Sequence, residues 1–218
     1  MTYMQFILEY LNEQDFGVPI YTETIAGKMA DYFGTQKKKA AAATAVAMKR
    51  IIDDNKLPDL RFYQKGVYYR TVMTPFGEMG ISKQALIADK YLIHDSGYET
   101  GKGLLHRLGL TTQMPGEHLF ATNAAKDCVR FDKKLEVSVC PPKTHITAEN
   151  KYYLQILDAI ELLDKAPVDA ENPYRIIANH IRLHGLQYET LLYYADKYYT
   201  RKTILTLAHT ASRTEERI

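Results

Sequence analysis

One stretch, residues 21–70, constrains the fold of this chain more than any other part of it. It begins with apolar residues at helical spacing, which are Ile25, Ala26, Met29, Ala30 and Phe33. Gly34-Thr35 interrupts that pattern, and a longer helix is predicted over residues 36–54, beginning with one glutamine and three lysines. Two short apolar runs then flank Gln64-Lys65-Gly66, which is typical of a β-hairpin. This order of helix, turn, basic helix and hairpin predicts a winged helix-turn-helix.

The positive charge of the chain is concentrated in the same stretch. The whole sequence carries a net charge of only +2. Residues 28–70 nevertheless contain ten lysines and arginines against four acids, whereas residues 71–218 contain eighteen side chains of each sign. A cationic patch on a nearly neutral chain favours contact with phosphates, so double-stranded DNA is the predicted partner. The alternative interpretation of the lysine run is a solvated helix face that binds nothing.

The residues predicted to contact DNA lie at the two ends of the basic helix and on or near the hairpin. They are Gln36, Lys37, Lys38, Lys39, Lys49, Arg50, Arg61, Lys65 and Arg70. We expect the side chains at the start of the helix to reach base edges and the hairpin cations to meet phosphates.

The length of 218 residues fits one large domain or two small ones. We expect a boundary at Thr74-Pro75-Phe76-Gly77, with a winged helix over residues 1–75 and a second domain over residues 76–218. In the second domain, Ser82 is expected to cap a helix, and four apolar stripes predict a helical end. Short strands are predicted near residues 118–122, 127–131 and 134–140. The predicted fold class is therefore α+β and helix-rich, with a small sheet in the second domain.

The segment Gly97–Gly103 invites comparison with a phosphate-binding loop. Such a loop needs four residues between its first glycine and Gly-Lys, followed by a serine or threonine that holds magnesium. Here only three residues separate Gly97 from Gly101-Lys102, and Gly103 stands where the loop would carry its serine or threonine. We interpret the glycines as positions of tight backbone packing and keep nucleotide binding in this region as an alternative hypothesis.

No other segment points to an enzyme, a metal or a cofactor. His180 and His184 are four residues apart, but Ile181 stands where a hydrolytic zinc helix carries glutamate. Two cysteines are too few for a disulfide framework. No apolar stretch reaches the roughly 18 to 20 residues that span a bilayer, so we expect a cytoplasmic protein without a membrane partner. Tyrosine pairs such as Tyr193-Tyr194 are consistent with a contact surface or with half-buried helix edges.

A resemblance to a known family rests on several short segments. They are Lys65–Arg70, Phe76-Gly77, Gly97–Gly101, Leu104–Gln113 with Pro115, and Ala121–Asn123. Together they resemble the AbiEi-like antitoxins of type IV toxin–antitoxin systems, over roughly residues 20–165. The run Gly-Leu-Thr-Thr-Gln-x-Pro, residues 109–115, is the most specific of these segments, whereas a winged helix alone is shared by many families.

The resemblance implies a two-part function. In that family the winged helix represses transcription of its own operon, and the C-terminal domain is needed for antitoxin activity. The toxin is a nucleotidyltransferase-like protein whose effect is counteracted without a tight direct complex. The alternatives are a stand-alone winged-helix regulator whose C-terminal domain binds a ligand or a protein, and a nucleotide-binding protein that uses the Gly97–Gly103 segment.

Overall fold

The computed structural model describes residues 1–212 and contains two compact units. The first unit spans Met1–Leu86, and the second begins at Ile87. Helices dominate both units and each also contains a small sheet, which confirms the predicted helix-rich α+β class. None of the helices in the described part of the chain is long and apolar enough to cross a membrane.

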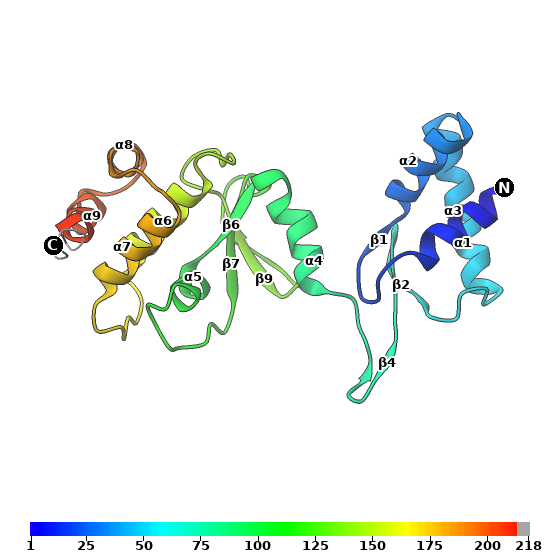
Figure 1. Cartoon of the computed structure of the whole chain (residues 1–218), viewed down its shortest axis with the longest axis horizontal. Coiled ribbons are helices and arrows are strands. Elements are labelled where there is room, and N and C mark those ends of the chain that lie inside the picture. The colour runs from blue at the N-terminus through cyan, green and yellow to red at the C-terminus, as the bar shows by residue number, and fades with distance from the viewer. Residues whose placement is uncertain (213–218) are drawn as a thin grey trace. The chain divides into compact units, whose positions relative to one another are not determined.

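The first unit has the element order of a winged helix (Figure 1). Its helices are α1 (Tyr3–Asn12), α2 (Thr22–Phe33) and α3 (Lys37–Asp53). Its strands are β1 (Ile20–Tyr21), β2 (Leu60–Gln64) and β3 (Val67–Arg70). They form an antiparallel sheet in the order β1-β3-β2, so the strand that precedes α2 pairs with the second arm of the hairpin.

One core holds these elements together. Ile7 and Leu11 of α1 meet Ile25 and Met29 of α2, and all four are fully buried. From α3 the core receives Ala40, Ala47, Met48 and Ile51. The apolar spacing that predicted α2 and α3 is therefore the spacing of the residues that face this core, and their polar residues are left on the outside.

The segment Thr74–Gly77, where a domain boundary was expected, is part of a hairpin. Strand β4 (Met73–Thr74) pairs with β5 (Gly77–Glu78), and Pro75-Phe76 forms the turn between them. Further hydrogen bonds tie this segment to the first unit, because Thr71 Oγ1 donates to Met79 O over 2.7 Å and Ser82 N donates to Gly17 O over 2.8 Å. The first unit consequently continues to Leu86, beyond the residue 75 expected from proline and glycine alone.

The second unit is built around a four-stranded sheet. Its strands are β6 (Gly97–Thr100), β7 (His118–Thr122), β8 (Arg130–Asp132) and β9 (Val137–Cys140). They lie in the order β6-β7-β9-β8, with β7 and β9 parallel and the other pairs antiparallel. Strand β7 has the predicted bounds, β8 and β9 overlap the predicted ranges 127–131 and 134–140, and β6 is an additional strand that was not predicted.

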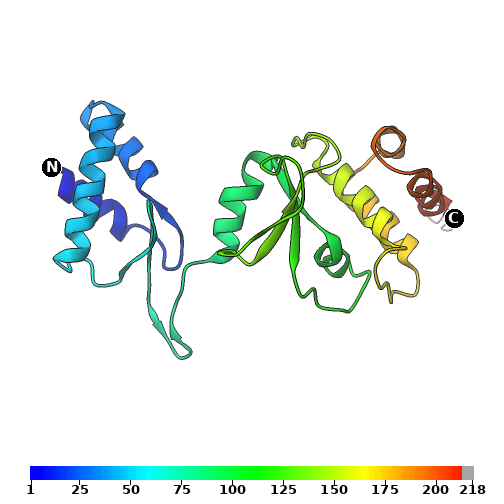
Figure 2. The same ribbon diagram turned by 180° about the vertical axis from the view of Figure 1, so that it is seen from behind.

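Helices surround this sheet. Helix α4 (Lys83–Ile87), which Ser82 caps as expected, continues into a π-helical turn, η1 (Ala88–Leu92), and a short 3-10 turn, η2 (Ile93–Asp95). Helix α5 (Gly101–Arg107) follows β6 directly. The helical end consists of α6 (Lys151–Leu162), α7 (Pro173–Leu183), α8 (Tyr188–Tyr198) and α9 (Arg201–Ser212). Helix α6 packs against β6 on one side and against α8 and α9 on the other (Figure 2).

Candidate functional site

Helix α3 separates a buried face from a cationic one. Ala40, Thr44, Ala47, Met48 and Ile51 are buried against the rest of the first unit. The candidate DNA-binding residues of the helix are all exposed: Lys37, Lys38, Lys39, Lys49 and Arg50. Lys38 and Lys49 lie opposite the buried residues, whereas Lys37 lies in the first turn, on the same side as Ala40. None of these five cations has an ion-pair partner among residues 1–212, so the structure leaves their charges available to an external anion.

The start of α3 also presents a free polar side chain. Gln36 is the N-cap residue, its backbone is extended, and its side chain makes no capping hydrogen bond. It is exposed beside Lys37. A glutamine amide can donate to and accept from a base edge, so this position suits the predicted contact.

Between its cationic ends, the exposed face of α3 carries only small side chains. These are Ala41, Ala42, Ala45 and Val46, of which Val46 is 52% exposed. Lys38 and Lys49 lie about 16 Å apart along the axis, because an α-helix rises about 1.5 Å per residue. That spacing exceeds the roughly 12 Å width of the DNA major groove, so the two ends can meet phosphates while the small side chains face the bases.

The three hairpin cations differ in what they can contact. Lys65 lies in the turn between β2 and β3 and is exposed. Arg61 is half-exposed, and its guanidinium contacts Glu78 Oε1 at 2.6 Å and Pro58 O at 2.7 Å. These contacts hold Arg61 against the β4–β5 hairpin, so Lys65 is the less restrained of the two.

Arg70 is held inside the first unit. Its Nε and Nη2 donate to Asp59 Oδ2 over 2.9 and 2.6 Å, and its Nη1 donates to Asn12 O over 2.8 Å. The guanidinium also lies over the ring of Phe16, and the side chain is only 14% exposed. Because these donors join β3 to the end of α1 and to the segment before β2, Arg70 has a structural role and we leave it out of the interface.

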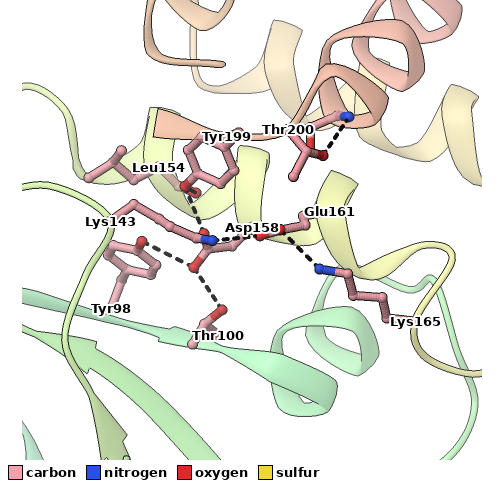
Figure 3. Close-up of polar contacts among 10 residues, drawn as sticks. Tyr98, Thr100, Lys143, Leu154, Asp158, Glu161, Lys165, Tyr199 and Thr200 are labelled. Atoms are coloured by element: carbon pink, nitrogen blue, oxygen red, sulfur yellow. Dashed lines mark hydrogen bonds and ion pairs between the residues drawn. The ribbon is translucent and has the colours of Figure 1, made fainter. Parts of the chain in front are cut away.

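The second unit contains a polar cluster around Asp158 of α6 (Figure 3). Its Oδ2 accepts hydrogen bonds from Tyr98 Oη over 3.1 Å and Thr100 Oγ1 over 2.8 Å, and its Oδ1 accepts one from Tyr199 Oη over 2.7 Å. Asp158 as a residue keeps some exposure, whereas its carboxylate is surrounded almost completely by protein atoms. The cluster joins β6, α6 and the end of α8 at one point.

Burial dominates the protonation behaviour of this cluster. It raises the pKa of Asp158 above the ordinary aspartate value, although the hydroxyls of Tyr199, Thr100 and Tyr98 oppose that shift by stabilising the carboxylate. Burial and the neighbouring Asp158 charge also raise the pKa of Tyr98 and of Tyr199, which keeps both phenols protonated as donors.

A chain of charges extends from the cluster toward solvent. Lys143 Nζ lies 3.2 Å from Glu161 Oε2 and over the ring of Tyr199, and Lys165 Nζ lies 3.0 Å from Glu161 Oε1. Burial acts to raise the pKa of Glu161, but the two lysines outweigh it and lower that pKa. The polar groups of the cluster have hydrogen-bond or ion-pair partners, and together they tie β6, α6 and the end of α8 to one another.

The glycines of Gly97–Gly103 are required by packing. A Cβ on Gly97 would overlap Tyr91 O, and one on Gly103 would overlap the Glu99 carboxylate. Gly101 has a left-handed backbone with φ +71° and lies against Leu119. Lys102 is exposed, and α5 is too short to supply a phosphate-binding terminus. Strand β6 forms the first four residues of this segment, and α5 begins directly after it.

His180 and His184 lie one turn apart, in α7 and at its C-terminal cap. Within residues 1–212 no cluster of three or more potential metal-ligating side chains occurs. The two imidazoles are stacked at 6.5 Å, and His180 Nε2 lies 3.2 Å from Leu108 O. The pair therefore belongs to the packing of α7 against the end of α5. Comparisons of the sequence with models of known protein families and with curated proteins found no match.

Proposed function

We propose that this protein binds duplex DNA through α3 and the β2–β3 turn, represses transcription from its own promoter, and acts as an antitoxin of the AbiEi-like type. The observation that carries the DNA-binding part is the exposed face of α3, where five cations without acidic partners in the described chain flank small side chains. The antitoxin part rests on the sequence resemblance described above.

The proposed interface contains Gln36, Lys37–Lys39, Lys49, Arg50 and Lys65, with Arg61 at its edge. The cations supply the affinity that does not depend on sequence, because each phosphate contact releases condensed counterions. Gln36 and the small side chains of α3 supply the discrimination between bases. The protein needs no cofactor or metal for this activity and performs no catalysis.

Replacement of Lys37, Lys38 and Lys39 together by alanine tests the interface. The helix should stay folded, because alanine has the highest helix propensity. Fluorescence anisotropy with a duplex from directly upstream of the coding region should show weaker binding, and the slope of log K against log salt should become shallower by about 0.9 per lost phosphate contact.

A charge-matched variant provides the control. Lys126, Lys133 and Lys134 are exposed in the second unit, and their replacement by alanine removes the same charge from the chain. This control should keep the wild-type affinity and salt slope. Equal losses in the two triple variants would show that α3 has no special role, and unchanged binding in the α3 variant would refute the interface.

The antitoxin part is tested separately from DNA binding. Co-expression with the nucleotidyltransferase-like protein encoded next to this chain should restore growth, and the α3 triple-alanine variant should still do so because the second unit is intact. The two proteins should elute separately in size-exclusion chromatography, since no tight complex is expected. If the neighbouring gene encodes no such toxin, the protein is instead a stand-alone winged-helix regulator.

A further inference from the structure

The second unit contains a cleft of about 340 Å³ that takes no part in the proposed DNA interface and shares Tyr98 with the Asp158 cluster. Side chains from β6, α5, α6 and α7 line it. Its volume lies at the lower end of the roughly 300–1,000 Å³ that small-molecule sites occupy. The cleft is therefore large enough for one compact organic molecule and too small for a folded partner.

One wall of the cleft is a row of nearly parallel rings. The Tyr152 ring and the His184 imidazole are stacked with centroids 4.8 Å apart and planes at 17°. His180 continues the row, because its imidazole is at 15° to that of His184. The row contains three rings, and because Tyr152 is 43% exposed and His184 is exposed as well, ring surface remains accessible to a fourth planar group. Aromatic and imidazole rings are the side chains on which nucleobases stack.

Two cations of the cleft keep free donors. Arg107 is 54% exposed, and its ion pair with Glu99 runs through Nη1 at 3.2 Å. A guanidinium has five N–H donors, so most of them remain available. Lys151 Nζ contacts Asp95 Oδ1 at 3.0 Å and lies over the Tyr152 ring, and an ammonium has two further donors. Arginine binds phosphate through its planar fork of donors and lysine binds it as a compact charge.

The rest of the lining fixes the shape of the cleft. Apolar side chains, Leu92, Leu108, Phe120 and Leu183, provide surface for an organic ring. Gln155 Nε2 donates to Glu99 O over 3.0 Å, which holds α6 against β6 beneath the cations. An apolar surface, a ring stack and two cations in one small cleft match a ligand that has both a planar base and a phosphate.

We propose that this cleft binds a nucleoside phosphate, with its base on the Tyr152–His184 stack and its phosphate held by Arg107 and Lys151. The Gly97–Gly103 segment takes part only through its strand, β6, and Lys102 is not among the lining residues. The ligand chemistry is shared by a free nucleotide and by a nucleotide of a single-stranded RNA. The proposal is independent of the proposed DNA binding, which involves the first unit.

Isothermal titration of the full-length protein tests this assignment. AMP, CMP, GMP and UMP are the nucleotide probes, adenosine supplies a base without phosphate, and inorganic phosphate supplies the anion alone. At least one nucleotide should bind more than tenfold tighter than adenosine and phosphate do. A five-nucleotide RNA, titrated into the α3 triple-alanine variant, identifies the source. Tighter binding of the RNA than of the mononucleotides assigns the cleft to a strand, and the reverse assigns it to a free nucleotide.

Single substitutions place the ligand in the cleft. Tyr152→Ala should weaken nucleotide binding by about tenfold, the loss expected for one stacking contact. Arg107→Gln should weaken binding of the nucleotide but leave that of adenosine unchanged. Tyr193→Ala, at a 55% exposed tyrosine of α8, is the matched control and should change nothing. Circular dichroism verifies that each variant is folded. Nucleotide binding that is no tighter than that of adenosine or phosphate, or that is equal in Tyr152→Ala and Tyr193→Ala, overturns the proposal.

Discussion

The hydroxyl of Tyr199 offers the sharpest test of the Asp158 cluster, because Tyr199→Phe removes one oxygen without changing the shape of the ring. In the structure this hydroxyl donates to Asp158 Oδ1 over 2.7 Å. Hydrogen bonds to charged groups contribute about 1.5–3 kcal/mol to stability. The substitution should thus lower the free energy of unfolding of the second unit by roughly 2 kcal/mol, since the surrounded carboxylate loses one of its three side-chain donors.

Urea denaturation followed by far-ultraviolet circular dichroism measures this effect. Tyr193→Phe is the control, because the Tyr193 hydroxyl only accepts a contact from Lys197 at the surface. Its free energy of unfolding should stay within about 0.5 kcal/mol of the wild type, as is usual for surface substitutions. If Tyr199→Phe is as stable as Tyr193→Phe, the hydrogen bond to Asp158 does not stabilise the joint between β6, α6 and α8, and the reasoning fails.

Three further predictions follow from the same structure. Because burial raises the pKa of Asp158, the folded state keeps the proton of this carboxyl group to a higher pH than the unfolded state does. The free energy of unfolding relative to Asp158→Asn should therefore fall as the pH rises from about 4 through the raised pKa, and urea titrations across that range measure it. Arg70→Ala should destabilise the first unit by roughly 3 kcal/mol in thermal unfolding, because Asp59 loses its partner, while the folded variant keeps its DNA affinity in anisotropy measurements. Replacing thymine by uracil in the bound DNA removes the base methyl groups that exposed residues such as Val46 would contact, and should weaken binding roughly fourfold per lost contact. An unchanged affinity would contradict that contact.

The helices of this chain could be predicted closely because each is specified by its own residues. Helix α2 contains the apolar residues whose spacing predicted it and ends where Gly34 was expected to break it, because Gly34 adopts a left-handed conformation. Strand β6 was missed because it has only four residues and begins with a glycine. A domain boundary was predicted at the β4–β5 hairpin because Pro75 and Gly77 signal a turn. A turn signal does not show whether the residues before and after it belong to the same domain.

The polar cluster lay beyond sequence reasoning for a different reason. Tyr98, Thr100 and Tyr199 are 60, 58 and 41 residues from Asp158 along the chain, so only the fold brings them together. One local signal was present, because Asp158 stands four residues after the fully buried Leu154 and therefore on the same helix face. The identity of its hydrogen-bond donors depends on which strand and which helix end pack there.

The fate of each cation in the first unit depends on the acceptors that the fold places around it. Arg70 and Arg61 face Asp59 and Glu78, whose carboxylates lie 2.6 Å from them, and their positive charge is largely neutralised there. The lysines at the start of α3 have no such acid within the described chain, because the adjoining positions of the helix are alanines. The net charge over residues 28–70 therefore overstates the positive charge that is available at Arg61 and Arg70. The charge without an acidic partner among the described residues is concentrated on α3 and Lys65. A phosphate backbone attracted by this charge would approach α3 first, which is the orientation that places the exposed small side chains of this helix against the bases.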